Sequence, residues 1–237
     1  MNARRLANAI RKQPPRAGHG AVEDDVPGVL HAALSPGEPL AIWRRSLPAG
    51  IRSELAPLAG SAPFAATAEG TPRDATASVI GELFPDAPRA LARDILDLAT
   101  MFADLAGTGG SVRVRLEAIT GPACQRWHAD AVRLRMLCTY LGEGTEWLPL
   151  PRGAFPAGAL DPAALPCAAS RLPAGAVAVM KGEGFGAGAG CVHRSPPTAR
   201  PGAPRLLLCV DEPGRLPACS LSPRATWPRM NPAWRDT

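Results

Sequence analysis

Two histidines and one aspartate have the types and spacing that could bind a metal ion. His128 and Asp130 lie two positions apart in residues 126–130, which precede an apolar run. On a β-strand, residues i and i+2 point to the same side, so this imidazole and carboxylate would lie together. His193, far along the chain, is the natural third ligand. Two histidines and one carboxylate with open coordination positions are typical of a non-haem Fe(II) site.

Cys191 allows a different metal site. It lies two positions before His193 on the same expected strand. Together with His128 and Asp130, these residues could close a tetrahedral zinc site with no open position, as in a binding or metal-handling protein. A third alternative is a metal-free interaction domain, in which these polar residues would share no common geometry.

The composition argues against nucleic-acid and membrane partners. The net charge is +5, but Lys12 and Lys181 are the only lysines, and arginines gather at both ends without a basic stripe interleaved with aromatic residues. No apolar run is long enough to span a bilayer, and the N-terminus lacks the apolar stretch of a signal peptide. The six cysteines show no C-x-x-C spacing, and several lie in apolar runs. We therefore expect free thiols and a cytoplasmic location.

The hydrophobic periodicity changes along the chain and predicts an α+β protein. Residues 74–106 carry the helical pattern, with one helix over 89–105 that ends at Gly107. From Val112 the apolar residues alternate, and strands are expected at about 125–130, 133–141, 145–149, 176–181, 190–194 and 205–211. Residues 63–72 are expected to form a loop, and residues 182–190 a long glycine-rich loop beside Lys181.

Helices followed by antiparallel strands favour a double-stranded β-helix, that is, a jelly-roll or cupin-like barrel with flanking helices. The predicted organisation is a flexible tail over residues 1–26, a single domain over 27–211 and a Pro-rich C-terminal tail over 212–237. Within the domain, the helical part covers 74–106 and the barrel covers 110–211.

Four segments of this chain are similar to those of a known bacterial family. They are WHAD at 127–130, TYLGEGTEWLP at 139–149, MKGE at 180–183 and VHRSPP at 192–197. These segments resemble the domain of unknown function 1826 family, and the resemblance covers about residues 27–211. The sequence GTEWLP is the most distinctive piece. Because this family has no established reaction, its name implies no function.

The order of the motifs also resembles the iron- and 2-oxoglutarate-dependent dioxygenases. That superfamily has H-x-D, a distal histidine and then a basic residue on the last strand, here Arg205. The resemblance implies that His128, Asp130 and His193 bind Fe(II), and that Arg205 pairs with the far carboxylate of 2-oxoglutarate. Arg133 or Arg135 could replace Arg205 in this role. The residues expected to contact the cosubstrate are Arg205, Tyr140, Arg135 and Lys181. The substrate, a small molecule or a protein, is not indicated.

Overall fold

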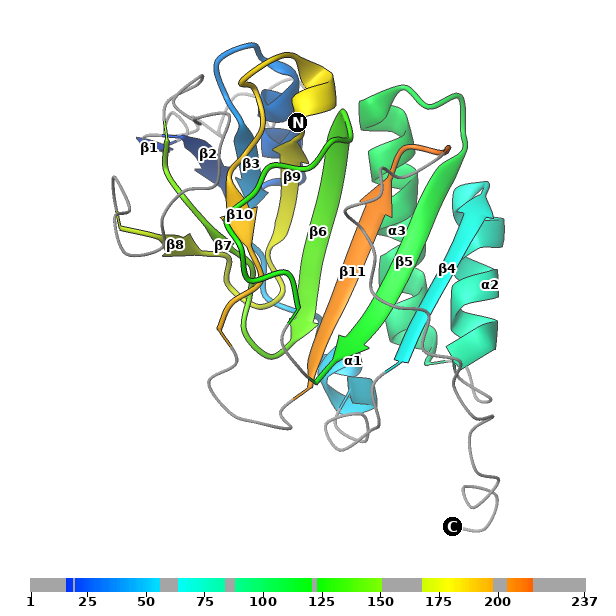
Figure 1. Cartoon of the computed structure of the whole chain (residues 1–237). Coiled ribbons are helices and arrows are strands. Elements are labelled where there is room, and N and C mark those ends of the chain that lie inside the picture. The colour runs from blue at the N-terminus through cyan, green and yellow to red at the C-terminus, as the bar shows by residue number, and fades with distance from the viewer. Residues whose placement is uncertain are drawn as a thin grey trace, which may run out of the picture.

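Helices cover one face of a large β-sheet, and a small second sheet lies against part of the other face (Figure 1). This is a computed structural model, and it describes residues 16–18, 20–55, 64–83, 88–120, 123–150, 168–197 and 204–214. The arrangement confirms the α+β class. The two sheets form no closed barrel within the described residues, so the complete jelly roll stays a prediction.

The large sheet has eight strands in the order β1-β2-β3-β9-β6-β11-β5-β4, and the small sheet has the order β10-β7-β8. All neighbouring strands are antiparallel except β2 and β3, which are parallel. The strands of the large sheet are β1 Arg16–Gly18, β2 Ala21–Asp24, β3 Leu40–Trp43, β9 Val177–Lys181, β6 Leu134–Leu141, β11 Arg205–Asp211, β5 Val112–Ile119 and β4 Phe64–Gly70, and those of the small sheet are β10 His193–Arg194, β7 Glu146–Trp147 and β8 Ser170–Arg171.

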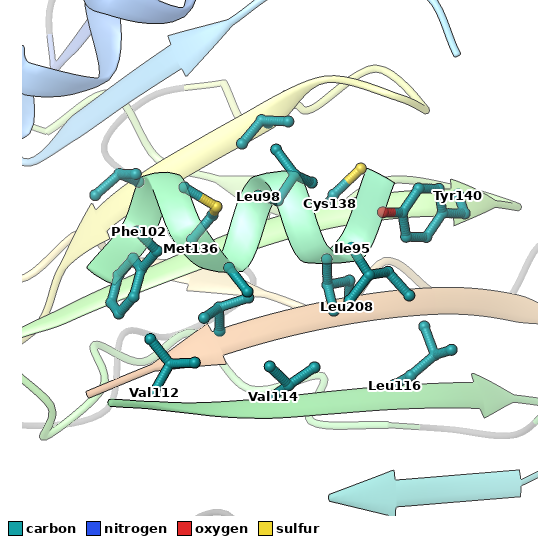
Figure 2. Close-up of a cluster of buried hydrophobic side chains, with 14 of the residues drawn as sticks. Ile95, Leu98, Phe102, Val112, Val114, Leu116, Met136, Cys138, Tyr140 and Leu208 are labelled. Atoms are coloured by element: carbon teal, nitrogen blue, oxygen red, sulfur yellow. The ribbon is translucent and has the colours of Figure 1, made fainter. Parts of the chain in front are cut away.

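The helix α3, Arg89–Ala106, packs on the middle of the large sheet. Its buried residues recur at three- and four-residue intervals and pack on β5, β6 and β11 (Figure 2). It ends at Gly107, whose φ of 65° is left-handed and whose amide donates to the Ala103 carbonyl. The predicted helix is therefore confirmed. The other helices are the 3-10 helix Pro27–Leu34, α1 Ala49–Leu55, α2 Pro72–Leu83 and the short 3-10 helix Glu183–Phe185.

The side chains of β6 alternate between the two faces of the large sheet. Met136, Cys138 and Tyr140 belong to the core beneath the helices. Leu137 belongs to a second core, which lies between the two sheets and includes Trp147 of the small sheet. Arg135 and Thr139 share the side of Leu137. A candidate residue on β6 can therefore face the small sheet only if its side chain points to the same side as Leu137.

Three local predictions differ from the structure. Residues 16–18 and 21–24 of the expected N-terminal tail belong to the sheet, because β1 pairs with β2 and β2 with β3. The expected loop at 63–72 is largely β4, which pairs with β5 along its whole length. The strand expected at 125–130 is not formed, since His128 makes only an isolated bridge, and the strands expected at 145–149 and 190–194 are reduced to β7 and β10. Of the predicted tails, residues 1–15, 19 and 215–237 lie outside the described residues.

Within the part of the chain that the structure describes, no helix combines the length and apolar character needed to cross a membrane.

Candidate metal centre

A reciprocal pair of main-chain hydrogen bonds brings His128 and His193 side by side. The His128 amide donates to the His193 carbonyl at 3.0 Å, and the His193 amide donates to the His128 carbonyl at 2.9 Å. This antiparallel bridge lies next to β10 of the small sheet. The centroids of the two imidazole rings are 4.5 Å apart. Backbone pairing therefore places two residues from distant segments at one point.

Asp130 completes the cluster. Its Oδ1 lies 3.8 Å from His128 Nε2, and its Oδ2 lies 3.4 Å from His193 Nε2. One ligand atom from each of the three residues lies within 4.8 Å of the other two. Ligand atoms at about 2.0–2.2 Å from one metal are roughly 3 Å apart, so small movements would close the site around an ion. The structure thus brings together the three residues that the sequence predicted as ligands.

Both imidazoles turn Nδ1 toward a main-chain carbonyl. The distance is 2.8 Å from His128 Nδ1 to the Arg126 oxygen and 3.0 Å from His193 Nδ1 to the Cys191 oxygen. A carbonyl oxygen only accepts, so each Nδ1 carries a proton, and Nε2 is the nitrogen that each ring can offer to a metal. Both Nε2 atoms lie near the Asp130 carboxylate. A carbonyl that orients the imidazole is the usual support of a metal-bound histidine.

The charge states of the cluster suit a metal. Burial lowers the pKa of His193, although the neighbouring carboxylate acts in the opposite direction. Burial alone would raise the pKa of Asp130, but His193, Arg135 and His128 together outweigh it, and the pKa is lowered. A neutral imidazole and an ionised carboxylate are the forms that bind metal ions. The three residues therefore fit a divalent cation, and their donor set matches the 2-His-1-carboxylate type.

Cys191 does not join this group. Its side chain is buried in the core between the two sheets. Burial also raises the pKa of its thiol. Among the described residues, the ligand atoms that converge belong to His128, Asp130 and His193. The tetrahedral zinc site with Cys191 as fourth ligand therefore receives no support from the structure.

Arg205 is buried on the side of β11 that faces the small sheet. Its Nη2 donates to Thr145 Oγ1 at 2.6 Å and its Nη1 to Ser195 Oγ at 3.3 Å, while its Nε has no hydrogen-bond partner. Within the described part of the chain, no carboxylate lies within 4.0 Å of this guanidinium. Burial lowers its pKa, although Cys209 and Glu117 act in the opposite direction. A buried cation without a carboxylate in direct contact is costly. The surroundings of Arg205 therefore suit an anionic ligand.

The register of the small sheet relates Arg205 to the metal ligands. Ser195, which Arg205 contacts, lies two residues after His193, a distance of about 7 Å along an extended chain. Because His193 pairs with Trp147, residue Thr145 lies opposite Ser195 and also faces inward. The anion site of Arg205 and the metal ligands thus lie on the same inner surface, about two residues apart along the strand that carries His193 and Ser195.

Tyr140 and Lys181, two of the residues expected to contact a cosubstrate, lie on the opposite face of the large sheet. The Tyr140 hydroxyl donates to Asp94 Oδ2 on α3 at 2.7 Å. The Lys181 ammonium donates to the Ser35 carbonyl and lies 4.4 Å from the centroid of the Phe185 ring. Both side chains have the strand parity that points toward the helices. The structure therefore corrects their assignment to the metal centre.

Arg135, a third expected contact, lies at the metal centre but already has partners. Its Nε and Nη2 donate to the two carboxylate oxygens of Asp211, at 2.7 and 3.0 Å. Its Nη1 lies 2.8 Å from Asp130 Oδ2. With two carboxylates in contact, Arg135 is not available to anchor a cosubstrate in the way that the sequence suggested.

The glycine-rich loop packs against the segment that carries His128 and Asp130. A Cβ added to Gly182 would lie 2.0 Å from the carbonyl oxygen of Val132 and 2.5 Å from that of Asp130. A Cβ added to Gly190 would lie 2.6 Å from Cβ of Ala129. These glycines allow two main chains to approach closely. The loop therefore supports the ligand-bearing segment.

Sequence reasoning missed three residues of this site. Asp211 is six positions after Arg205, so a strand with a period of two would have placed both on one face. Ser195 is two positions after His193 and could have been found in the same way. Thr145 gave no signal, because its role depends on the pairing of β7 with β10.

Comparisons with solved structures gave only weak likenesses. A bsmA homolog from Methylobium petroleophilum PM1 is 14% identical, covering 78% of this chain and 91% of that chain, with a TM-score of 0.42. A Pseudomonas putida prolyl-4-hydroxylase is 13% identical, covering 80% and 99%, with a TM-score of 0.41. A putative 2OG-Fe(II) oxygenase family protein from Caulobacter crescentus is 14% identical, covering 77% and 79%, with a TM-score of 0.38. At these values the likenesses assign no function. No match was found among curated proteins.

The match to a protein family extends over most of the chain. The profile described as protein of unknown function (DUF1826) matches residues 24–211, which include all three candidate ligands, the glycine-rich loop and β11. This confirms the family resemblance predicted from the sequence motifs. The chain belongs to the DUF1826 family.

Proposed function

We propose that this chain is an Fe(II)-dependent oxygenase that uses 2-oxoglutarate as cosubstrate. The observation that carries the proposal is that one ligand atom from each of His128, Asp130 and His193 lies within 4.8 Å of the other two, with both Nε2 atoms near the carboxylate. Fe(II) bound to two histidines and a carboxylate supplies open positions for a chelating cosubstrate and for O₂.

In this proposal, Arg205 binds the far carboxylate of 2-oxoglutarate. Its guanidinium is buried, has no carboxylate within 4.0 Å among the described residues and is flanked by the hydroxyls of Thr145 and Ser195. The two hydroxyls can add hydrogen bonds to the same carboxylate. The length of a five-carbon dicarboxylate matches the two-residue spacing between Ser195, at this anion site, and His193.

The remaining features of the proposal follow from the same arrangement. The two sheets would be the halves of a jelly-roll barrel formed by the single domain 27–211, with the metal centre between them. The four cysteines in the described residues are free thiols, which agrees with a cytoplasmic location. The oxidised substrate, a small molecule or a protein, would enter beside the open metal positions.

The metal assignment is tested by anaerobic Fe(II) titration of the wild type and of the His128→Ala and His193→Ala variants. The wild type should bind one equivalent, and each variant should bind much more weakly because one of three ligands is missing. If either variant keeps full stoichiometry and affinity, that histidine is not a ligand and the proposed site is wrong.

The cosubstrate is tested with Arg205→Met and with Arg113→Met as the matched control. Arg113 lies on the same sheet but pairs with Glu69 at 2.8 Å. Titration of the iron-loaded proteins with 2-oxoglutarate should show about ten- to a hundredfold weaker binding for Arg205→Met, because charge-assisted hydrogen bonds contribute about 1.5–3 kcal/mol. Arg113→Met should bind normally. No binding of 2-oxoglutarate to the iron-loaded wild type would refute the oxygenase proposal.

A further inference from the structure

Arg135 joins two carboxylates that come from different parts of the chain. On one side, its Nε and Nη2 bind both oxygens of Asp211, a residue that is 1% exposed. The two residues are direct cross-strand partners of β6 and β11. On the other side, Nη1 lies 2.8 Å from Asp130 Oδ2. One planar guanidinium therefore spans the gap between the sheet and a candidate metal ligand.

The pair with Asp211 fixes the direction of the third contact. A bidentate carboxylate sets both the position and the plane of a guanidinium. With that plane fixed by the sheet, Nη1 is kept 2.8 Å from Asp130 Oδ2 as an ion pair, although this oxygen accepts no hydrogen bond. Oδ2 of Asp130 is thereby kept beside a cation, while Oδ1 faces His128.

We infer that Arg135 is a positioning residue, which holds Asp130 so that this carboxylate binds the metal through one oxygen. The inference rests on the metal-binding part of the proposed function. A carboxylate free to rotate could give both oxygens to the ion and take up a position needed by a cosubstrate. The Asp211–Arg135 pair, built into the large sheet, prevents that rotation. Partners that orient metal ligands in this way commonly contribute 10- to 100-fold to metal affinity.

A merely structural role for Arg135 is the competing explanation, since its pair with Asp211 also links β6 to β11. Two variants that preserve the net charge of the site separate the two roles. Arg135→Lys keeps the positive charge but lacks the fork that can contact two carboxylates at once. The double variant Arg135→Met with Asp211→Leu removes one positive and one negative charge together, and replacing a buried ion pair by apolar residues is often tolerated by the fold.

The test is anaerobic titration of the full chain with Co(II), whose visible absorption responds to the number and geometry of its ligands. Both variants should bind Co(II) 10- to 100-fold more weakly than the wild type and should show an altered spectrum. The matched control is Arg133→Lys, because Arg133 pairs with Glu212 and with the Ala106 carbonyl instead of a metal ligand. The control should match the wild type in affinity and spectrum.

The outcomes distinguish this inference from the proposed function. Wild-type affinity and spectrum in both charge-preserving variants would overturn the positioning role, even if their melting temperatures fell. If the wild type binds Co(II) but not 2-oxoglutarate, the oxygenase proposal fails, while weakened Co(II) binding in the variants still supports the role of Arg135. If the wild type binds no Co(II), both ideas are wrong.

Discussion

Replacing Gly182 with alanine should disturb the metal centre by steric contact alone. Gly182 has a φ of −103°, which any residue adopts, so the substitution adds no backbone strain. The new Cβ would lie 2.0 Å from the carbonyl oxygen of Val132 and 2.5 Å from that of Asp130. Both atoms belong to the main chain and cannot rotate away. The segment that carries the ligand must therefore move.

The expected loss of stability can be estimated from these contacts. Overpacking a well-packed site costs about 1–3 kcal/mol, and a main-chain contact this short places Gly182→Ala at the upper end. Since 1 kcal/mol changes Tm by about 2–4 °C in a protein of this size, Tm should fall by about 6–12 °C. The displaced Asp130 should also bind metal more weakly, so the rise in Tm that a bound metal produces should become smaller.

The assay is thermal unfolding with and without Co(II), and Gly81→Ala is the matched control. Gly81 lies in α2, and an added Cβ there would have nothing within 4 Å. Alanine in a helix is more favourable than glycine by about 0.5–1 kcal/mol, so the control should be slightly stabilised. A Gly182→Ala protein with the Tm and the metal-induced shift of the wild type would refute the close approach of the two segments.

Three other substitutions test the placement of individual residues. Cys191→Ser should keep full metal stoichiometry, measured by metal analysis, because the thiol packs in the core; loss of metal would restore the zinc alternative. Tyr140→Phe should cost about 1.5–3 kcal/mol in urea unfolding through the lost hydrogen bond to Asp94, and a change in metal affinity would contradict its placement beneath the helices. Burial opposes ionisation of Glu146, but hydrogen bonds from two arginines outweigh this effect and lower the pKa of Glu146 below 4.5. The ionised carboxylate therefore stabilises the fold above that pH, and this stabilisation is lost as the pH falls through the lower pKa of the folded state. Glu146→Gln should therefore be less stable than the wild type near neutral pH, and the difference should shrink below pH 4.5; a constant difference in unfolding free energy across that range would show that the ion pairs contribute nothing.

The sequence by itself determined the features that depend on local spacing. The 3.6-residue period and Gly107 were sufficient for α3, because an amphipathic stripe and a left-handed end residue are properties of neighbouring positions. The two-residue spacing of His128 and Asp130 indicated a shared face, and the residue types indicated a metal. His193 followed as the partner from chemistry alone, without any knowledge of its distance.

Only the tertiary structure decided which face of the sheet each other candidate occupies. Tyr140 and Arg135 lie on one strand, but they differ by an odd number of positions and so point to opposite sides. Which side holds the metal ligands depends on where the small sheet packs, and no local pattern carries that information. The same holds for β4, whose small residues form a strand because β5 offers its edge. The Asp130–Arg135–Asp211 contacts arise in this way too, because they need β6 to pair with β11 and the His128 segment to pair with β10.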